Sequence, residues 1–115
     1  MLRTILLFIA LCITANSWAN ATIDSLSNSL THKNDSNDCK TYQRLCFAYL
    51  DIDLDKAKDC AQKALAIAKS INRESSIISS KNAIGLTHFY KSEYEKAKKY
   101  WQSALLSVNN SNKNY

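Results

Sequence analysis

The sequence repeats itself after 40 residues, and this repeat limits the fold more than any other feature of the chain. Segment 54–65 aligns with segment 94–105, and six of the twelve aligned positions are identical. Internal periods of this size are typical of proteins that stack similar pairs of helices. The two copies are anchored by shared alanines: Ala57 and Ala64 in the first copy, Ala97 and Ala104 in the second.

Each copy predicts two helices. In the first copy, apolar residues at 54, 57, 61, 64, 65 and 68 recur three or four positions apart, which places them on one face of a helix. The second copy repeats this stripe with larger side chains, among them Trp101. The first helices of the two copies are expected at 39–50 and 76–90. Asp53 and Ser92 are expected to cap the second helices, Ser92 together with Glu95.

The scarcity of residues that break helices supports an all-α fold. After residue 21 the chain has no proline and a single glycine, Gly85, so long helices form readily and tight β-turns are difficult. A glycine inside a helix costs about 1 kcal/mol relative to alanine. We therefore expect Gly85 at a close contact between two helices. The predicted architecture is an all-α solenoid of antiparallel helix hairpins, with two repeats and a short N-terminal helix.

The first 21 residues have the layout of a secretory signal peptide. Arg3 precedes an unbroken run of nine apolar residues at 5–13, and small residues follow at the positions that a signal peptidase requires. Cleavage after Ala19 or after Ala21 fits equally well. An uncleaved membrane anchor is the alternative, but nine apolar residues fall short of the roughly 20 that span a bilayer. The predicted location is secreted or periplasmic.

The predicted organisation after the signal peptide follows the repeat. A short N-terminal helix and linker are expected at 22–38, and Ile23, Leu26 and Leu30 share one helical face that could cover the end of the stack. The two repeats occupy 39–72 and 73–108. An Asn-rich tail is expected at 109–115.

Composition argues against several classes of site. Lys and Arg exceed Asp and Glu by 15 to 10, but half of the basic residues after residue 21 are interleaved with acidic ones, as on a solvated helix face, and we expect no nucleic-acid partner. The two histidines lie far apart and no C-x-x-C pair exists, so neither a metal nor a cofactor is expected. No nucleophile–base arrangement or glycine-rich phosphate loop is present, which predicts that the protein is not an enzyme. His88, on an apolar stripe, is expected to be a packed core residue.

Three cysteines remain after the signal peptide: Cys39, Cys46 and Cys60. An oxidising compartment permits disulfides, but an odd number cannot all pair within one chain. Cys46 and Cys60 fall on the two helices of one predicted hairpin. The sequence leaves open whether they form a disulfide or remain two small buried thiols.

The spacing of these residues resembles the tetratricopeptide repeat. The resemblance covers about residues 39–108, although the 40-residue period exceeds the usual 34 of that family. Cys46 stands where a small Gly or Ala is usual, His88 where Tyr is usual, and no proline closes either repeat. The residues that carry the pattern are Leu45, Cys46, Ala57 and Ala64 in the first copy, and Ile84, Gly85, Ala97, Trp101 and Ala104 in the second.

The resemblance implies a binding groove for a protein or peptide, lined by the first helix of each repeat. The positions that it assigns to this groove are Gln43, Phe47, Leu50, Asn82, Leu86, Phe89 and Tyr90. The alternative is that a following repeat or the N-terminal helix covers them. The expected function is a non-catalytic protein–protein interaction scaffold of the cell envelope.

A second function is consistent with the order of the segments. A signal peptide, a short helix and then such repeats is similar to the extracytoplasmic N-terminal parts of envelope sensor kinases and transcriptional regulators of Bacteroidetes-type bacteria. On that reading the chain is a signal input domain, and a membrane segment and an effector part would lie beyond residue 115. Because two repeats rarely bury a continuous core, either further repeats follow or a partner supplies the missing layer.

Overall fold

The computed structural model describes residues 1–113, except for the side chains of residues 15, 16 and 111. This range forms five helices and contains no strand, which confirms the all-α prediction. The helices are α1 (Leu2–Asn28), α2 (Ser36–Tyr49), α3 (Leu54–Ser70), α4 (Glu74–Tyr90) and α5 (Tyr94–Asn112).

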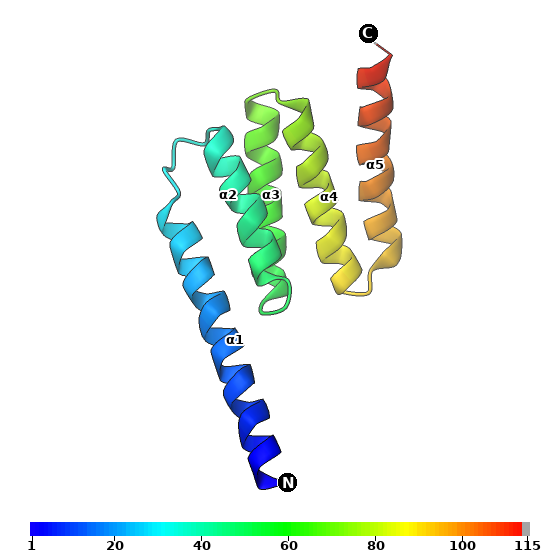
Figure 1. The fold of residues 1–115 in the computed structure, drawn as a ribbon. Coiled ribbons are helices and arrows are strands. Elements are labelled where there is room, and N and C mark those ends of the chain that lie inside the picture. Colours follow the sequence, from blue (N-terminus) through cyan, green and yellow to red (C-terminus); the bar gives the residue numbers. More distant parts are fainter. Residues whose placement is uncertain (114–115) are drawn as a thin grey trace.

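The helices pack in the order of the chain. Each helix lies against the next one, and α2 also contacts α4. In Figure 1 the N-terminal part of α1 extends beyond the other helices, whereas α5 lies at the opposite edge. Within residues 1–113, α4 is the one helix that packs against α5, so one long side of α5 has no neighbour.

Turns without glycine end two of the helices. Asn72 follows α3 with φ 51°, and Ser92 follows α4 with φ 62°, the left-handed conformation that usually calls for glycine. After each of them, the next N–H bonds back to the carbonyl five residues before it: Arg73 to Ala68 and Glu93 to His88, at 3.1 and 2.9 Å. These bonds satisfy carbonyls that a helix end would otherwise leave unpaired.

Helix starts agree with the sequence at one of the two predicted caps. Asp53 caps α3, and its carboxylate accepts from the backbone N–H groups of Asp55 and Lys56, both at 3.1 Å. The prediction for Ser92 is wrong. An N-cap residue has extended backbone, whereas Ser92 is left-handed because it ends α4, and Glu93 instead precedes the first residue of α5.

Among the helices of the two repeats, α2 and α5 extend furthest beyond their predicted bounds. Helix α2 begins at Ser36 because Asp35 caps it by accepting from the Asp38 N–H at 3.0 Å. Helix α5 continues to Asn112, into the range 109–115 that the sequence marks as an Asn-rich tail. No Gly or Pro interrupts this range. A stretch of polar residues can therefore continue the helix to that point.

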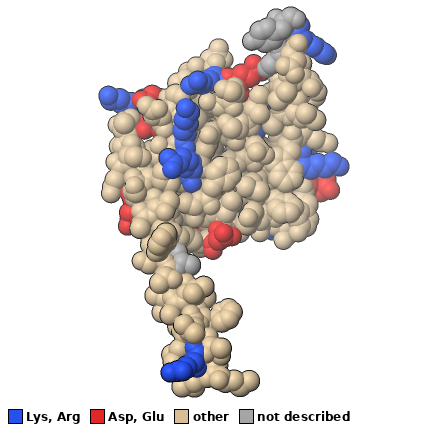
Figure 2. Space-filling view, in the orientation of Figure 1, with Lys and Arg blue, Asp and Glu red and all other residues tan. Residues whose placement is uncertain are grey.

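The last turns of α1 join the core, and the rest of the helix does not. Ile23 and Leu26 are buried in the core cluster where α1 packs on α2, and Leu30 packs on the same cluster. In contrast, the large apolar side chains before residue 19 are exposed, from Leu2 to Trp18. This part of the chain is nearly free of charge, with Arg3 the one Lys, Arg, Asp or Glu among residues 1–23, and Figure 2 shows it as an almost uncoloured projection.

A buried carboxylate fixes the linker between α1 and α2. Asp38 accepts hydrogen bonds from the Thr31 N–H at 2.8 Å, the Asn34 N–H at 3.0 Å and the Thr31 hydroxyl at 3.1 Å. The bond from the Thr31 backbone N–H contributes most to lowering the pKa of Asp38 below its ordinary value. Asp38 thereby holds a linker that contains two left-handed residues, His32 and Asn34.

Candidate protein-binding site

The structure divides the seven predicted groove residues into an exposed and a packed group. Phe47, Asn82, Phe89 and Tyr90 are exposed, and Leu86 is partly buried. The remaining two, Gln43 and Leu50, belong to contacts inside the protein. The exposed members could meet a partner, whereas the packed ones contribute to the fold.

Gln43 joins the two repeats. Its side-chain nitrogen lies 3.0 Å from the hydroxyls of Ser79 and Ser80 and 3.5 Å from the Ser76 carbonyl, all on α4. Leu50 is 7% exposed and belongs to the main core cluster. Gln43 faces inward because its side chain is long enough to reach the hydroxyls on α4. Leu50 faces inward because the neighbouring hairpin covers it.

An aromatic cluster lies on α4 and the start of α5. We define it as Phe89, Tyr90, Tyr94 and Trp101, and each of its side chains is at least one-third exposed. The ring of Phe89 is 5.4 Å from Tyr94, 5.9 Å from Trp101 and 6.4 Å from Tyr90, measured between centroids. Sequence reasoning placed only Phe89 and Tyr90 at the binding surface. Trp101 belongs to the predicted packed stripe, and Tyr94 aligns with Leu54 of that stripe. Their large size compared with Ala61 and Leu54 is the signal that they reach further.

Trp101 covers the single glycine of the chain. A β carbon placed on Gly85 would lie 2.5 Å from the Trp101 Nε1 atom and 2.7 Å from its Cδ1 atom. The indole N–H also donates to the Asn82 carbonyl at 3.4 Å. Gly85 therefore lies at a close contact between α4 and α5, as the sequence predicts.

The other residues that define the repeat are buried. Leu45, Cys46 and Ile84 have 3% or less of their surface exposed. The four anchoring alanines, Ala57, Ala64, Ala97 and Ala104, are buried as well. Trp101 is the exception in this group at 36% exposed, because nothing in the described chain covers the outer side of its ring.

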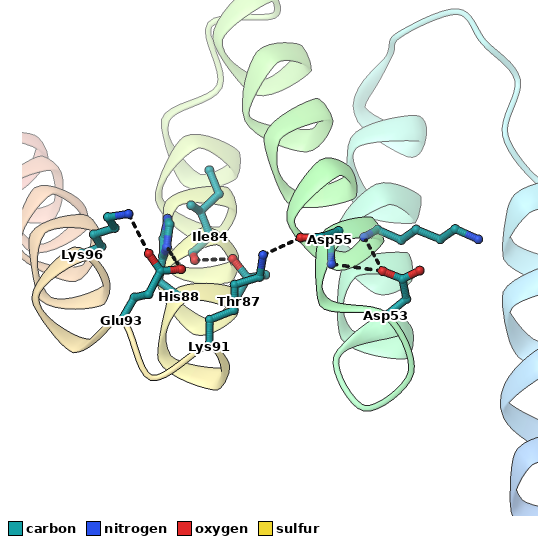
Figure 3. Close-up of polar contacts among 9 residues, drawn as sticks. Asp53, Asp55, Ile84, Thr87, His88, Lys91, Glu93 and Lys96 are labelled. Carbon is teal, nitrogen blue, oxygen red and sulfur yellow. Dashed lines mark hydrogen bonds and ion pairs between the residues drawn. The ribbon is translucent and has the colours of Figure 1, made fainter.

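Ion pairs connect the lower ends of the helices (Figure 3). The Lys91 ammonium after α4 lies 2.5 Å from the Asp55 carboxylate of α3 and thus joins the second hairpin to the first. This hydrogen bond lowers the pKa of Asp55 and raises the pKa of Lys91. Glu93 pairs with Lys96 at 2.6 Å, and this bond is the main cause of its lowered pKa.

His88 is a packed core residue, as expected. It is buried, and its ring stacks on Tyr100 with the centroids 5.5 Å apart. Its Nδ1 atom lies 3.6 Å from a Glu93 oxygen, a distance that suits an ion pair with a protonated histidine but is too long for a hydrogen bond.

The three cysteines after residue 21 are buried, free thiols in the structure. Burial, together with a smaller effect of the nearby Cys60, raises the pKa of Cys46 to about 12. Burial is also the first cause of the raised pKa of Cys39 and of Cys60. Thiols with raised pKa values are poor nucleophiles.

Two further findings concern ligands and membranes. Among the described residues no group of three or more His, Cys, Asp or Glu side chains could hold a metal ion. In the same part of the chain α1 is the one helix long and apolar enough to cross a bilayer, and a signal sequence has the same properties.

The site therefore consists of exposed aromatic side chains on a helical framework. Comparison with protein-family models, with curated proteins and with solved structures gives no match for this chain.

Proposed function

We propose that the chain is a non-catalytic protein-binding scaffold of the cell envelope, built as a short solenoid of tetratricopeptide-like hairpins. The aromatic cluster carries this proposal. Aromatic side chains are enriched where proteins bind each other, because their rings bury a large area while losing little rotamer freedom. Four of them, in contact with one another and open to solvent, exceed what a monomer of this size needs on its surface.

The packing of α1 supports the envelope location. Its exposed apolar residues before position 19 require a membrane, a translocation channel or removal, whereas Ile23 and Leu26 are part of the core. Among the described side chains of α1, the first buried one is that of Ile23, two residues after Ala21, which is one of the two predicted cleavage positions. Mass determination of the protein recovered from a bacterial host would distinguish cleavage after Ala19 from cleavage after Ala21. A full-length protein in the membrane fraction would instead indicate an uncleaved anchor.

Site-specific photocrosslinking tests the binding function. A photoreactive phenylalanine analogue placed at Phe47 or at Phe89 in the natural host should give discrete crosslinked products, because both side chains are about half exposed. The analogue at Gln62, which is exposed on α3, is the matched control. Products that appear equally at all three positions, or at none, would contradict a specific binding surface.

A further inference from the structure

The second hairpin exposes the face that the first hairpin buries. Helices α4 and α5 correspond to α2 and α3 in the repeat, and α4 covers the first hairpin. Leu50 is 7% exposed, whereas its counterpart Phe89 is 45% exposed; Ala61 is 0% exposed, whereas its counterpart Trp101 is 36% exposed. Leu105, the counterpart of the partly buried Leu65, is 60% exposed. We call this face of α4 and α5 the open face.

Three polar links hold α4 on the first hairpin. Gln43 donates to the hydroxyls of Ser79 and Ser80 near the middle of the contact. At one end Lys91 pairs with Asp55, as Figure 3 shows. At the other end the Arg73 guanidinium donates to the Ser36 hydroxyl at 2.7 Å.

The open face carries a counterpart of each acceptor or donor that binds α4. The repeat places Asn82 where the first hairpin has Gln43, Glu95 where it has Asp55, and Ser75 where it has Ser36. All three are exposed, and no side-chain hydrogen bond or ion pair is described for any of them. An amide, a carboxylate and a hydroxyl thus surround an apolar face in the same order as in the closed contact.

We propose that the open face binds a helix of the same chemistry as α4, supplied by a separate polypeptide. This inference rests on the proposed function and identifies its partner. Such a helix carries small residues where α4 has Ser76, Ser80, Ala83 and Thr87, all of them buried. It has a cation to meet Glu95 and a second cation at its other end to meet Ser75. Small side chains on the partner suit the larger residues of the open face, because close packing requires complementary volumes.

A second copy of the chain does not fit this description. In each copy Lys91 is already paired with Asp55, Arg73 with Ser36, and the small residues of α4 are buried. To present α4 to a neighbour, a copy would have to open its own core. The proposal therefore assigns the bound helix to a polypeptide other than a second copy of this chain.

A synthetic peptide of residues 73–91 is the probe, added to the whole protein carrying Trp18→Phe. Trp101 is then the one tryptophan left, and its emission reports on the open face. We expect a saturable blue shift as the indole leaves water. Leu105→Glu should weaken peptide binding about tenfold or more, because it places an unpaired charge in the contact. Gln102→Glu is the matched control and should leave binding unchanged, since its counterpart Gln62 stays exposed beside α4.

A charge exchange tests the orientation of the bound helix. Glu95→Lys should weaken binding about twofold to fivefold, the range of an exposed ion pair. A peptide with Lys91→Glu should recover that loss when it is paired with the Glu95→Lys protein. Circular dichroism of each variant verifies that it is folded.

Several results would overturn the inference. The inference fails if the peptide does not bind, or if Gln102→Glu and Leu105→Glu weaken peptide binding equally. It also fails if the protein sediments as a dimer and its Trp101 emission is that of a buried indole without the peptide. Failure of the peptide together with specific crosslinks from Phe47 would reject this partner and keep the scaffold function. Failure of both experiments would reject the scaffold function as well.

Discussion

The indole of Trp101 occupies the space that a side chain on Gly85 would need, with its Nε1 atom 2.5 Å from the position of a β carbon. The first hairpin arranges the same two positions differently, with Cys46 and Ala61, both completely buried. A small residue facing a large one in one repeat thus replaces two small residues in the other.

This contact predicts that Gly85→Ala changes the free energy of unfolding in opposite directions, depending on whether residue 101 is Trp or Ala. In the natural protein the change should lower the free energy of unfolding by about 1 kcal/mol, because displacement of the indole outweighs the gain in helix propensity. In a Trp101→Ala background the same change should raise it by about 1 kcal/mol, the propensity gain alone. Urea unfolding of the four proteins measures both effects. The same sign in both backgrounds would show that the contact does not restrict residue 85.

Glycine at the turn between α4 and α5 should stabilise the protein. Ser92 has φ 62°, which costs a residue with a β carbon about 1–2 kcal/mol, and glycine avoids this cost while losing more entropy on folding. We expect Ser92→Gly to raise the free energy of unfolding by about 0.5–1 kcal/mol. Asn72→Gly is the control and should gain less, because asparagine tolerates this conformation. A destabilised Ser92→Gly protein would contradict the left-handed assignment.

Residues 50 and 89 should respond differently to truncation, although they are equivalent in the repeat. Leu50→Ala should lower the free energy of unfolding by about 2–5 kcal/mol, as for a buried leucine. Phe89→Ala should lower it by less than about 1.5 kcal/mol, because its ring is half exposed and loses mainly contacts with other aromatic rings. Thermal and urea unfolding measure both changes. A large loss for Phe89→Ala would place this ring in the core instead of on a binding surface.

Asp38 makes the stability of the linker depend on pH. Its pKa is lowered in the folded protein, so the carboxylate stabilises the fold fully above its ordinary pKa of 3.8, and this stabilisation is lost as the pH falls through the lowered value. The difference in unfolding free energy between the natural protein and Asp38→Asn should be constant near neutral pH and shrink below about pH 4. Asp24→Asn, at an exposed carboxylate of α1, serves as the control. A difference that persists unchanged into strong acid would contradict a role for the ionised group.

Thiol counting decides between the two states of Cys46 and Cys60. In the folded protein without residues 1–21, burial and the raised pKa values should keep Cys39, Cys46 and Cys60 from reacting with a thiol reagent near pH 8. In denaturant three thiols should react, because the structure describes all of them as free. One reactive thiol instead of three would demonstrate the disulfide.

The helices and their pairing were predictable because they depend on local pattern. The spacing of the anchoring alanines, the cap at Asp53 and the close contact at Gly85 each follow from one short segment. Which residues lie on the proposed binding surface was harder to predict. Whether Gln43 and Leu50 face a partner or the interior depends on the neighbouring hairpin, and the repeat pattern assigns them the same role as Asn82 and Phe89.

Turn geometry was the other source of error. Ser92, followed three residues later by Glu95, has the sequence of a helix cap. The same serine must also end α4, in a chain with no glycine at that turn, and the left-handed conformation that this requires excludes capping. A sequence pattern records the preference of one element, and here two elements compete for one residue.

The abrupt change along α1 has a consequence for how the mature protein holds its first residues. Cleavage after Ala21 would leave a helix of only seven residues, 22–28, with a new positively charged amino terminus at the end where a helix already carries partial positive charge. A helix so short does not persist in water by itself. Its survival would depend on Ile23 and Leu26 remaining in the core, so the N-terminal end of the stack would be closed by these two side chains and the partly buried Leu30, which could detach while the rest stays folded.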